Sequence, residues 1–523
     1  MENSPTLLSI VSSYLTFVNI ILLILGWIIV PFLYQIIYYR FFHPLRQYPG
    51  PFWGTVTRLW YTFHSFNQSE LTTYQNLFEE TKAPVLRISP TTLLVKSAFA
   101  LPLIYHRTAV KSRFYSNGGL PSEPVISIRG HQAHSARRRL VGPPYSYSKI
   151  LKAEPLVDKI ISAWLAKLRT IFEETGKPVN MASWATYFAF DTISEVGFGQ
   201  ALGFVEKEED VGGLIQSVHD GVEIFGVLAH LYPFVERLTS GPLKSFFTAT
   251  PDMKNGMGQL MRWRNKIINA RITENEEGKE RERLDLLESF FEARTPEGKP
   301  LSRTELEAEV LVVLVAGADT TGTSFSSILT DILSSPSDYA RMMKEIDTGF
   351  TSGNLSQPIP KAAEVSKHCP FYVACVKESL RLTPSSPALF PREVTADQPP
   401  LVIDGKIIPA GTEITCCSYI TNRDKEIYGE DADIFRPERW LEDEEKTKLF
   451  EKYNFTWGYG SRVCLGKDLA YMELMKSPLM FFRNFNFKLC APSKETPGPP
   501  RRVILGGLFH WEDIWLSLQK RKV

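Results

Sequence analysis

The stretch "WGYGSRVCLG", from Trp457 to Gly466, places one cysteine in a run that contains three glycines and an arginine. Glycines allow a tight loop in which backbone N–H groups turn toward the sulfur of Cys464. The residues that follow, "LGKDLAYMELMKSPLMFF", predict a helix, and the start of a helix favours a negative charge. The pattern therefore predicts that Cys464 serves as a thiolate ligand rather than as a buried thiol.

The composition excludes several other classes of function. The 523 residues carry 59 Lys and Arg against 58 Asp and Glu, a net charge of +1, which gives nucleic-acid binding no electrostatic support. The six cysteines contain no C-x-x-C pair, so we expect neither a zinc site nor a disulfide framework, and we predict a reducing compartment. With no internal repeat or long linker, one large domain is expected.

The N-terminus predicts a membrane anchor. No charged residue occurs between Asn3 and Tyr39, and residues 14–33 alone are long enough to cross about 30 Å of hydrocarbon. A basic n-region and a small-residue cleavage site are both missing, so we expect a retained anchor rather than a cleaved signal peptide. Arg40 and Arg46 follow the span, which places the body in the cytosol. We predict an anchor over residues 1–40, a proline-rich hinge over 41–52 and a catalytic domain over 53–523.

The periodicity of the body predicts a mainly α fold with small β-sheets. Helical patterns cover residues 149–175 and 180–199, whereas residues 84–95 and 401–417 resemble strands, the second pair turning at Asp404-Gly405.

One predicted helix has a sequence that indicates a functional role. It begins with a capping box of Ser302 and Glu305 and is expected to continue until Pro336. Its middle, "AGADTTG" (316–322), contains two glycines, each of which costs about 1 kcal/mol relative to alanine. Small residues here let another group approach the backbone beside the acid and the alcohol of Asp319 and Thr320. The alternative is a close helix crossing with a solvated aspartate.

Together these motifs resemble the cytochrome P-450 family. "WGYGSRVCLG" matches the family's haem-binding loop, F-x-x-G-x-R-x-C-x-G, except at Trp457. "AGADTT", "ESLR" and "PERW" are similar to three other family motifs and occur in the family's order. The resemblance covers essentially the whole chain. It implies a cytochrome P-450 fold behind a single N-terminal transmembrane helix, and haem b whose iron is bound by Cys464.

The resemblance also implies roles for individual residues. Asp319 and Thr320 are expected to control proton delivery, and Glu378, Arg381 and Arg439 to form a buried structural lock. The expected cofactor-binding residues are His134, Arg138, Arg392, Trp457, Arg462, Cys464 and Gly466, with His131 as a rival of His134. The apolar pocket is expected to include Ile126, Ile128, Ala316, Leu389, Phe390, Leu508 and Phe509, each of which suits a plain core as well.

The implied activity is that of a monooxygenase, which oxidises a lipophilic small molecule with O2 and electrons from NADPH. The chain has no flavin or nicotinamide fingerprint, so NADPH-cytochrome P-450 reductase is the expected partner. Lys467 and Lys476 are candidates for its docking face. The implied location is the endoplasmic reticulum membrane, with membrane lipid as a further partner.

Several stretches resemble fungal enzymes of the pisatin demethylase-like group, which favours secondary-metabolite biosynthesis on a terpenoid, polyketide or alkaloid-like substrate. Detoxification of a foreign compound is the alternative. Two other readings stay open: an oxygen-independent isomerase or dehydratase on the same fold, which the presence of Asp319 and Thr320 disfavours, and a non-enzymatic membrane haem sensor.

Overall fold

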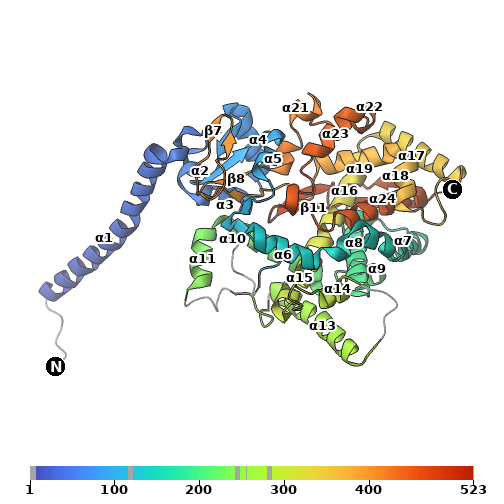
Figure 1. The fold of residues 1–523 in the computed structure, drawn as a ribbon, viewed down its shortest axis with the longest axis horizontal. Helices are drawn as coiled ribbons and strands as arrows, with labels where there is room; N and C mark the ends of the chain where they lie inside the picture. The colour runs from blue at the N-terminus through green and yellow to red at the C-terminus, as the bar shows by residue number, and fades with distance from the viewer. Residues whose placement is uncertain (1–6, 116–121, 242–247, 255, 280–284, 522–523) are drawn as a thin grey trace.

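The computed structural model describes residues 7–115, 122–241, 248–254, 256–279 and 285–521. Helix α1 (Leu7–Ile37) projects away from a body of helices and small sheets (Figure 1). Within these ranges, two stretches are long and apolar enough to cross a membrane. Val18–Phe42 has a mean hydropathy of 2.6 and is not buried, whereas 72% of the window in Arg303–Leu333 is buried. The first therefore fits a membrane anchor and the second is the core of the body.

The predicted hinge is packed against the body. A π-helical turn (Tyr38–Phe42) and a 3-10 turn (Pro44–Gln47) connect α1 to α2 (Phe52–Val56). Leu45 and Tyr48 are buried, and the backbone N–H of Arg87 donates to Pro49 O at 2.7 Å. A side chain on Gly50 would collide with the carbonyl of Arg87. The inner part of this segment is thus held against strand β1 (Val85–Arg87) rather than free to bend.

The largest sheet has the strand order β1-β2-β8-β5-β3. Strands β2 (Thr92–Val95) and β8 (Glu413–Thr415) run parallel, and the other pairs, including β5 (Arg392–Glu393) with β3 (Val110–Lys111), are antiparallel. The predicted hairpin is present as β6 (Val402–Ile403) and β7 (Lys406–Ile407), which turn at Asp404 and Gly405 with φ of 52° and 70°. A further sheet and hairpin are formed by β4 (Val179–Asn180), β12 (Trp515–Lys520) and β9 (Phe485–Leu489), and by β10 (Arg501–Leu505) with β11 (Leu508–Glu512).

The main core lies between four long helices. The predicted helices appear as α7 (Tyr147–Thr175) and α8 (Met181–Phe198). Trp164 of α7 is fully buried, and its ring meets Phe188 of α8, Phe325 of α16 (Asp319–Leu333) and Phe481 of α24 (Lys467–Asn484), with centroids 5.6 to 6.0 Å apart. Aromatic rings bury large apolar areas, so this cluster contributes strongly to stability.

Other helices surround these four. They are α3 (Arg58–Phe66), α4 (Glu70–Thr81), α5 (Leu101–Ile104), α6 (His131–Val141), α9 (Phe204–Lys207), α10 (Leu214–His230), α11 (Tyr232–Ser240), α13 (Gly256–Glu276), α14 (Leu286–Glu292), α15 (Arg303–Gly317), α17 (Pro336–Thr351), α18 (Ala362–His368), α19 (Pro370–Leu382), α20 (Ser418–Thr421), α21 (Lys425–Tyr428), α22 (Arg439–Glu442) and α23 (Glu444–Tyr453).

The helix expected from Ser302 to Pro336 is interrupted. The capping box of Ser302 is present, but α15 ends at Gly317 and α16 begins at Asp319. A Cβ on Gly317 would lie 2.6 Å from Ile193 Cγ1, and one on Gly322 would lie 2.9 Å from Thr186 Cα. Both glycines therefore permit a close crossing with α8.

Candidate functional site

The cysteine loop connects α23 to α24. Gly458 and Gly460 have φ of 75° and 65°, which side chains rarely adopt, and a side chain on Gly460 would also collide with the carbonyl of Tyr105. The backbone N–H of Cys464 donates to Trp457 O at 2.9 Å. These constraints fix the direction of the cysteine side chain.

The Cys464 side chain is solvent accessible, in contrast to Cys369, Cys375, Cys416 and Cys417, which are buried. Burial in the surrounding protein nevertheless raises the pKa of its thiol, while the N–H of Gly466 opposes the rise. Both observations are met if the sulfur faces an internal cavity. A thiol in such a place loses its proton when it coordinates a metal ion.

Three cations predicted to hold the cofactor, Arg138, Arg392 and Arg462, lie close together. Arg138 Nη1 donates to Val463 O at 2.9 Å, and Arg462 donates to Ile128 O at 2.7 Å and to Arg129 O at 2.5 Å. Burial, followed by the nearby Arg392, lowers the pKa of Arg462 to about 10.

His134 is buried against the same charges. Burial, followed by Arg462, lowers its pKa to about 3. His131, its rival, is only partly buried and hydrogen-bonds Ser135 Oγ at 3.4 Å. The geometry therefore favours His134.

The cation cluster lacks a matching anion among the described residues, where no ion pair joins Arg138, Arg392 or Arg462 to a carboxylate. Two of its nitrogen atoms, His134 Nδ1 and Arg392 Nε, are buried without a hydrogen-bond partner. Buried cations are costly unless an anion compensates them. The cluster therefore fits a dianionic group such as the two propionates of haem, and guanidinium groups suit carboxylates.

Lys111 and Tyr115 join this cluster, and no sequence motif indicated either residue. Lys111 Nζ lies 3.9 Å from the centroid of the Tyr115 ring and is buried, and burial followed by Arg392 lowers the pKa of Lys111 well below its usual range. Strand pairing explains its position, because Lys111 of β3 is opposite Arg392 of β5. Because Lys111 and Arg392 are far apart in the chain, no local motif connects them.

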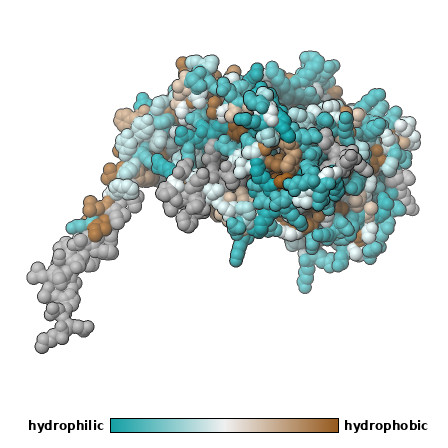
Figure 2. All heavy atoms as spheres, turned by 60° about the horizontal axis from the view of Figure 1, so that its bottom comes forward, coloured by the Kyte–Doolittle hydropathy of each residue, from teal (hydrophilic) through white to brown (hydrophobic). Residues whose placement is uncertain are grey.

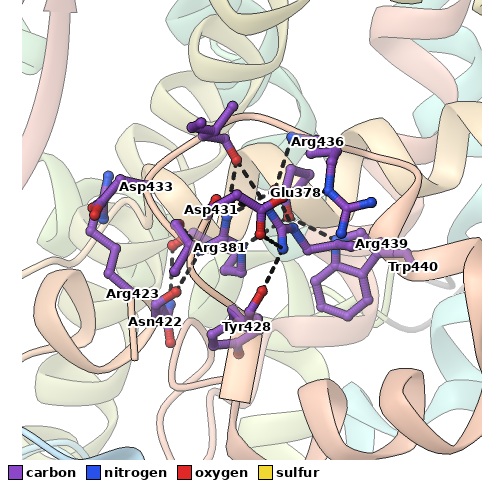
Figure 3. A network of polar contacts seen from close by, with 12 residues as sticks. Glu378, Arg381, Asn422, Arg423, Tyr428, Asp431, Asp433, Arg436, Arg439 and Trp440 are labelled. Atoms are coloured by element: carbon purple, nitrogen blue, oxygen red, sulfur yellow. Dashed lines mark hydrogen bonds and ion pairs between the residues drawn. The ribbon is translucent and has the colours of Figure 1, made fainter. Parts of the chain in front are cut away.

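Glu378, Arg381 and Arg439 meet in one buried network (Figure 3). The carboxylate of Glu378 accepts from Arg381 Nε and Nη2 and from Arg439 Nε, each at 2.8 Å, and from Trp440 Nε1 at 2.9 Å. Although burial opposes it, Arg381 and then Arg439 hold the pKa of Glu378 below its usual value. Further bonds run to the carbonyls of Asn422, Ala432, Tyr428 and Asp431. The network joins α19 to the loop before the cysteine segment.

The acid and the alcohol of the central helix lie at its break. Thr320 Oγ1 donates to Ala316 O at 2.9 Å, and Ala316 is exposed although the helix is a core element, so this side of the helix is accessible. Asp319 is 2% exposed, so the solvated aspartate of the alternative reading is wrong. The close helix crossing of that reading is present, through Gly317 and Gly322.

Asp319 lies beside two histidines that the sequence did not indicate. His219 Nε2 of α10 is 3.3 Å from Asp319 Oδ1, and the rings of His219 and His510 of β11 are 4.4 Å apart. Although burial lowers it, the hydrogen bond with Asp319 raises the pKa of His219, whereas burial lowers that of His510 to about 4. Three distant segments supply these residues, which explains why no motif revealed them.

The expected pocket residues differ in their exposure. Ile126 is half exposed, whereas Ile128, Leu389 and Phe509 are buried. Leu389 and Phe509 pack in a core cluster beside the large sheet, and Phe390 stacks edge-on against Phe455 at 5.2 Å, under the cysteine loop. Leu508 is half buried. Residues 116–121 of the first expected pocket segment lie outside the described residues.

One expectation about the docking surface is wrong. Lys476 is fully buried, and its ammonium group pairs with Glu154 at 2.7 Å and with Asp158 at 2.5 Å. It therefore belongs to the contact between α24 and α7, whereas Lys467 is exposed. The periodicity of α24 did not reveal this, because the pairing acids come from another helix.

Comparisons with known proteins agree with the site. The family model described as cytochrome P-450 matches residues 44–506. The chain is 39% identical to quiannulatic acid synthase of Emericella variicolor over 97% of this chain and 96% of that protein. It is 32% identical to cytochrome P-450 monooxygenase gsfF of Penicillium aethiopicum, over 88% and 91%. It is 28% identical to cytochrome P-450 monooxygenase cicH of Emericella nidulans, over 94% and 95%. The chain therefore belongs to the cytochrome P-450 family, whose members bind haem b through a cysteine thiolate, and it is an oxidoreductase of the monooxygenase class that requires O2, a redox partner and a small-molecule substrate.

Proposed function

We propose that Cys464 is the axial ligand of haem iron in this monooxygenase and that the cation cluster holds the haem propionates. The observation that carries the proposal is the coincidence of two features. Cys464, the most exposed cysteine in the described part of the chain, lies in a glycine-constrained loop, and beside it lie buried and partly buried cations with no compensating carboxylate among the described residues. Bound haem with thiolate ligation supplies reductive activation of O2 and transfer of one oxygen atom to the substrate.

The residues around the central helix break control protons in this proposal. The Thr320 hydroxyl, which donates to Ala316 O, can redirect its O–H toward the cavity and donate a hydrogen bond there. Asp319, which is already hydrogen-bonded to His219, relays protons between that imidazole and the hydroxyl in this proposal. The buried lock of Glu378, Arg381 and Arg439 serves only to position the segment that leads to the cysteine loop.

We propose a single-pass location in the endoplasmic reticulum membrane, with the body in the cytosol. Figure 2 shows brown, hydrophobic residues on the coloured part of the projecting N-terminal segment, whereas most of the visible body is hydrophilic. Exposed aromatic and aliphatic side chains continue from this helix over neighbouring elements of the body: Phe52, Trp53, Leu59, Phe63, Phe66 and Phe234. Such a patch suits contact with lipid. The sequons at Asn67, Asn354 and Asn454 are then expected to carry no glycans, and glycans on them would reverse the orientation.

We propose a lipophilic substrate of fungal secondary metabolism and NADPH-cytochrome P-450 reductase as the electron donor. Several relatives are fungal monooxygenases, and one is named for an acid product. Oxidation of a carbon centre as far as a carboxylic acid is therefore included in the proposal. Product analysis should search for alcohols and acids alike.

The test of the ligand is the difference spectrum of the reduced protein with carbon monoxide. The parent and Cys490→Ala are expected to show the band characteristic of thiolate ligation, and Cys464→Ala is expected to lose it. Cys490 is a suitable control because it is partly exposed and lies outside the loop. Survival of the band in Cys464→Ala would contradict the assignment. Substrate-dependent consumption of NADPH and O2 with the reductase separates a monooxygenase from an isomerase or a sensor.

A further inference from the structure

The cluster of His219, Asp319 and His510 contains the donor atoms of a metal site. One nitrogen of each imidazole and one carboxylate oxygen all lie within 4.8 Å of one another. Ligand atoms around a tetrahedral zinc ion lie roughly 3.3 Å apart, since zinc bonds to nitrogen and oxygen are about 2.0–2.2 Å long. His219 Nε2 and Asp319 Oδ1 are already 3.3 Å apart. Since every pair lies within 4.8 Å, no pair has to move closer by more than about 1.5 Å to reach this spacing.

Two polar atoms of this cluster have no hydrogen-bond partner. Asp319 Oδ2 and His510 Nε2 are both buried and unpartnered, in side chains that are 2% and 6% exposed. Buried polar atoms without a partner are costly to leave unpaired. A cation between them would satisfy the carboxylate, and the imidazole nitrogen would become a ligand after a change of tautomer or a ring flip.

The three elements that supply the donors are tightly fixed to one another. On either side of His510, Phe509 O accepts from Thr323 Oγ1 at 2.8 Å and Trp511 Nε1 donates to Ser327 Oγ at 2.9 Å, so β11 is attached to α16. Helix α10 packs against the turn before β11, where a side chain on Gly226 would collide with Gly506. Such rigidity favours metal binding because little conformational entropy is lost on binding.

The exposure of the cluster and the types of its ligand atoms favour a zinc-like ion. His219 is 23% exposed, which gives the cluster an opening, whereas the two deeper ligands are enclosed. Two imidazoles with one carboxylate suit zinc and its neighbours among the transition metals, whereas Mg²⁺ and Ca²⁺ prefer oxygen ligands. We propose that His219, Asp319 and His510 bind one Zn²⁺ ion, with one coordination position left for water.

Bound zinc would also change turnover, and this second part rests on the proposed role of Asp319. Zinc would occupy the Asp319 oxygen that now hydrogen-bonds His219, so Asp319 would be withdrawn from proton delivery. Zinc is therefore expected to lower the amount of product formed per NADPH and to raise the yield of peroxide. The binding itself does not depend on this role.

The experiment uses the full-length haem protein without a polyhistidine tag. After treatment with a chelator it is dialysed against Zn²⁺, and zinc per haem is measured together with the zinc-edge X-ray absorption. The parent is expected to retain one zinc per haem with two imidazole ligands. His219→Gln and His510→Gln are expected to weaken binding at least 10-fold. His368→Gln, at the half-exposed end of α18, is the matched control and is expected to bind like the parent. Mg²⁺ in place of zinc is expected not to be retained.

The outcomes test the metal site and its effect on turnover separately. Absence of stoichiometric zinc in the parent, or equal retention in His219→Gln, would overturn the metal site whatever the reaction of the enzyme. His219 is partly exposed, so this variant is expected to fold, and its carbon monoxide band verifies that it has done so. Zinc binding in the parent without any change in product per NADPH would keep the site and refute the proton role of Asp319.

Discussion

Substitution of Glu378 in the lock tests the packing behind the cysteine loop. In Glu378→Gln the side chain keeps its size and loses its charge, while Arg381 and Arg439 remain 0% and 1% exposed. One of the two acceptor oxygens becomes an NH2 group. Whichever oxygen is replaced, it faces at least two donors, because Oε1 accepts from both arginines and Oε2 accepts from Arg381 and Trp440.

The size of the effect follows from two independent routes. Two hydrogen bonds to charged groups are lost, each worth about 1.5–3 kcal/mol. Removal of one partner from a buried ion pair costs about 3–5 kcal/mol. Both routes predict a loss of about 4 kcal/mol in the stability of this region. This loss corresponds to roughly a thousandfold increase in the population of molecules in which the region is locally unfolded. That is a large fraction of the stability of a typical folded protein.

The assay is native-state amide hydrogen exchange of α19, with haem content as a second readout. Protection of the α19 amides in Glu378→Gln is expected to fall by about three orders of magnitude wherever exchange occurs through the opening of this region. The control Glu430→Gln removes an exposed partner of Lys425 and is expected to leave protection unchanged. Equal protection in the two variants would refute the conclusion that one carboxylate compensates both arginines.

Three further substitutions test other parts of the molecule. Burial raises the pKa of Glu70 from 4.5 to about 7, so the folded state binds the extra proton. The parent should therefore lose roughly 3 kcal/mol of unfolding free energy relative to Glu70→Gln as the pH rises from 4.5 to 7, measured by urea titration; a constant difference would contradict this sign. Gly460→Ala is expected to abolish haem incorporation because its Cβ would collide with the Tyr105 carbonyl. Gly353→Ala has the same sign of φ and no neighbour within 4 Å, so it should cost only about 1–2 kcal/mol of unfolding free energy. Similar losses of stability and haem in the two variants would exclude a clash at Gly460. Thr320→Ala should divert electrons to peroxide and Thr320→Ser should restore coupling, whereas an unchanged product yield per NADPH would remove the hydroxyl from proton delivery.

Local patterns predicted the parts of the fold that depend on local chemistry. The capping box at Ser302, the turn at Asp404 and Gly405, and the long helices α7 and α8 all follow from short sequence signals, and all are present. The cysteine loop belongs to the same class, because glycine spacing determines its shape. Where backbone geometry is decided by neighbours in the chain, the sequence is sufficient.

Features that arise from long-range packing were missed or mistaken. Lys476 looked like a surface lysine until α7 supplied its acidic partners, and Lys111 reaches the cation cluster only through its pairing with Arg392. His219 and His510 are in the same position, since they meet Asp319 from two other elements. These side chains carry no local signal, and their chemistry is created by the tertiary contacts.

The lock and the cation cluster differ in the way their charges are compensated. Two buried arginines of the lock share the carboxylate of Glu378 and several backbone carbonyls, and Arg439 also pairs with Asp431 Oδ1 at 3.1 Å, so the charges of this part of the protein are compensated within it. The cluster around Arg392 and Arg462 has no such partner among the described residues, and its cations depress one another's pKa. Its folding free energy must therefore include the binding of the dianionic cofactor, because a ligand that binds only the folded state stabilises that state. The lock is thus the part of the scaffold that can form before haem enters, and Asn422, whose carbonyl accepts from Arg381, connects it to the segment that leads to Cys464 by donating to Thr456 Oγ1 at 3.1 Å.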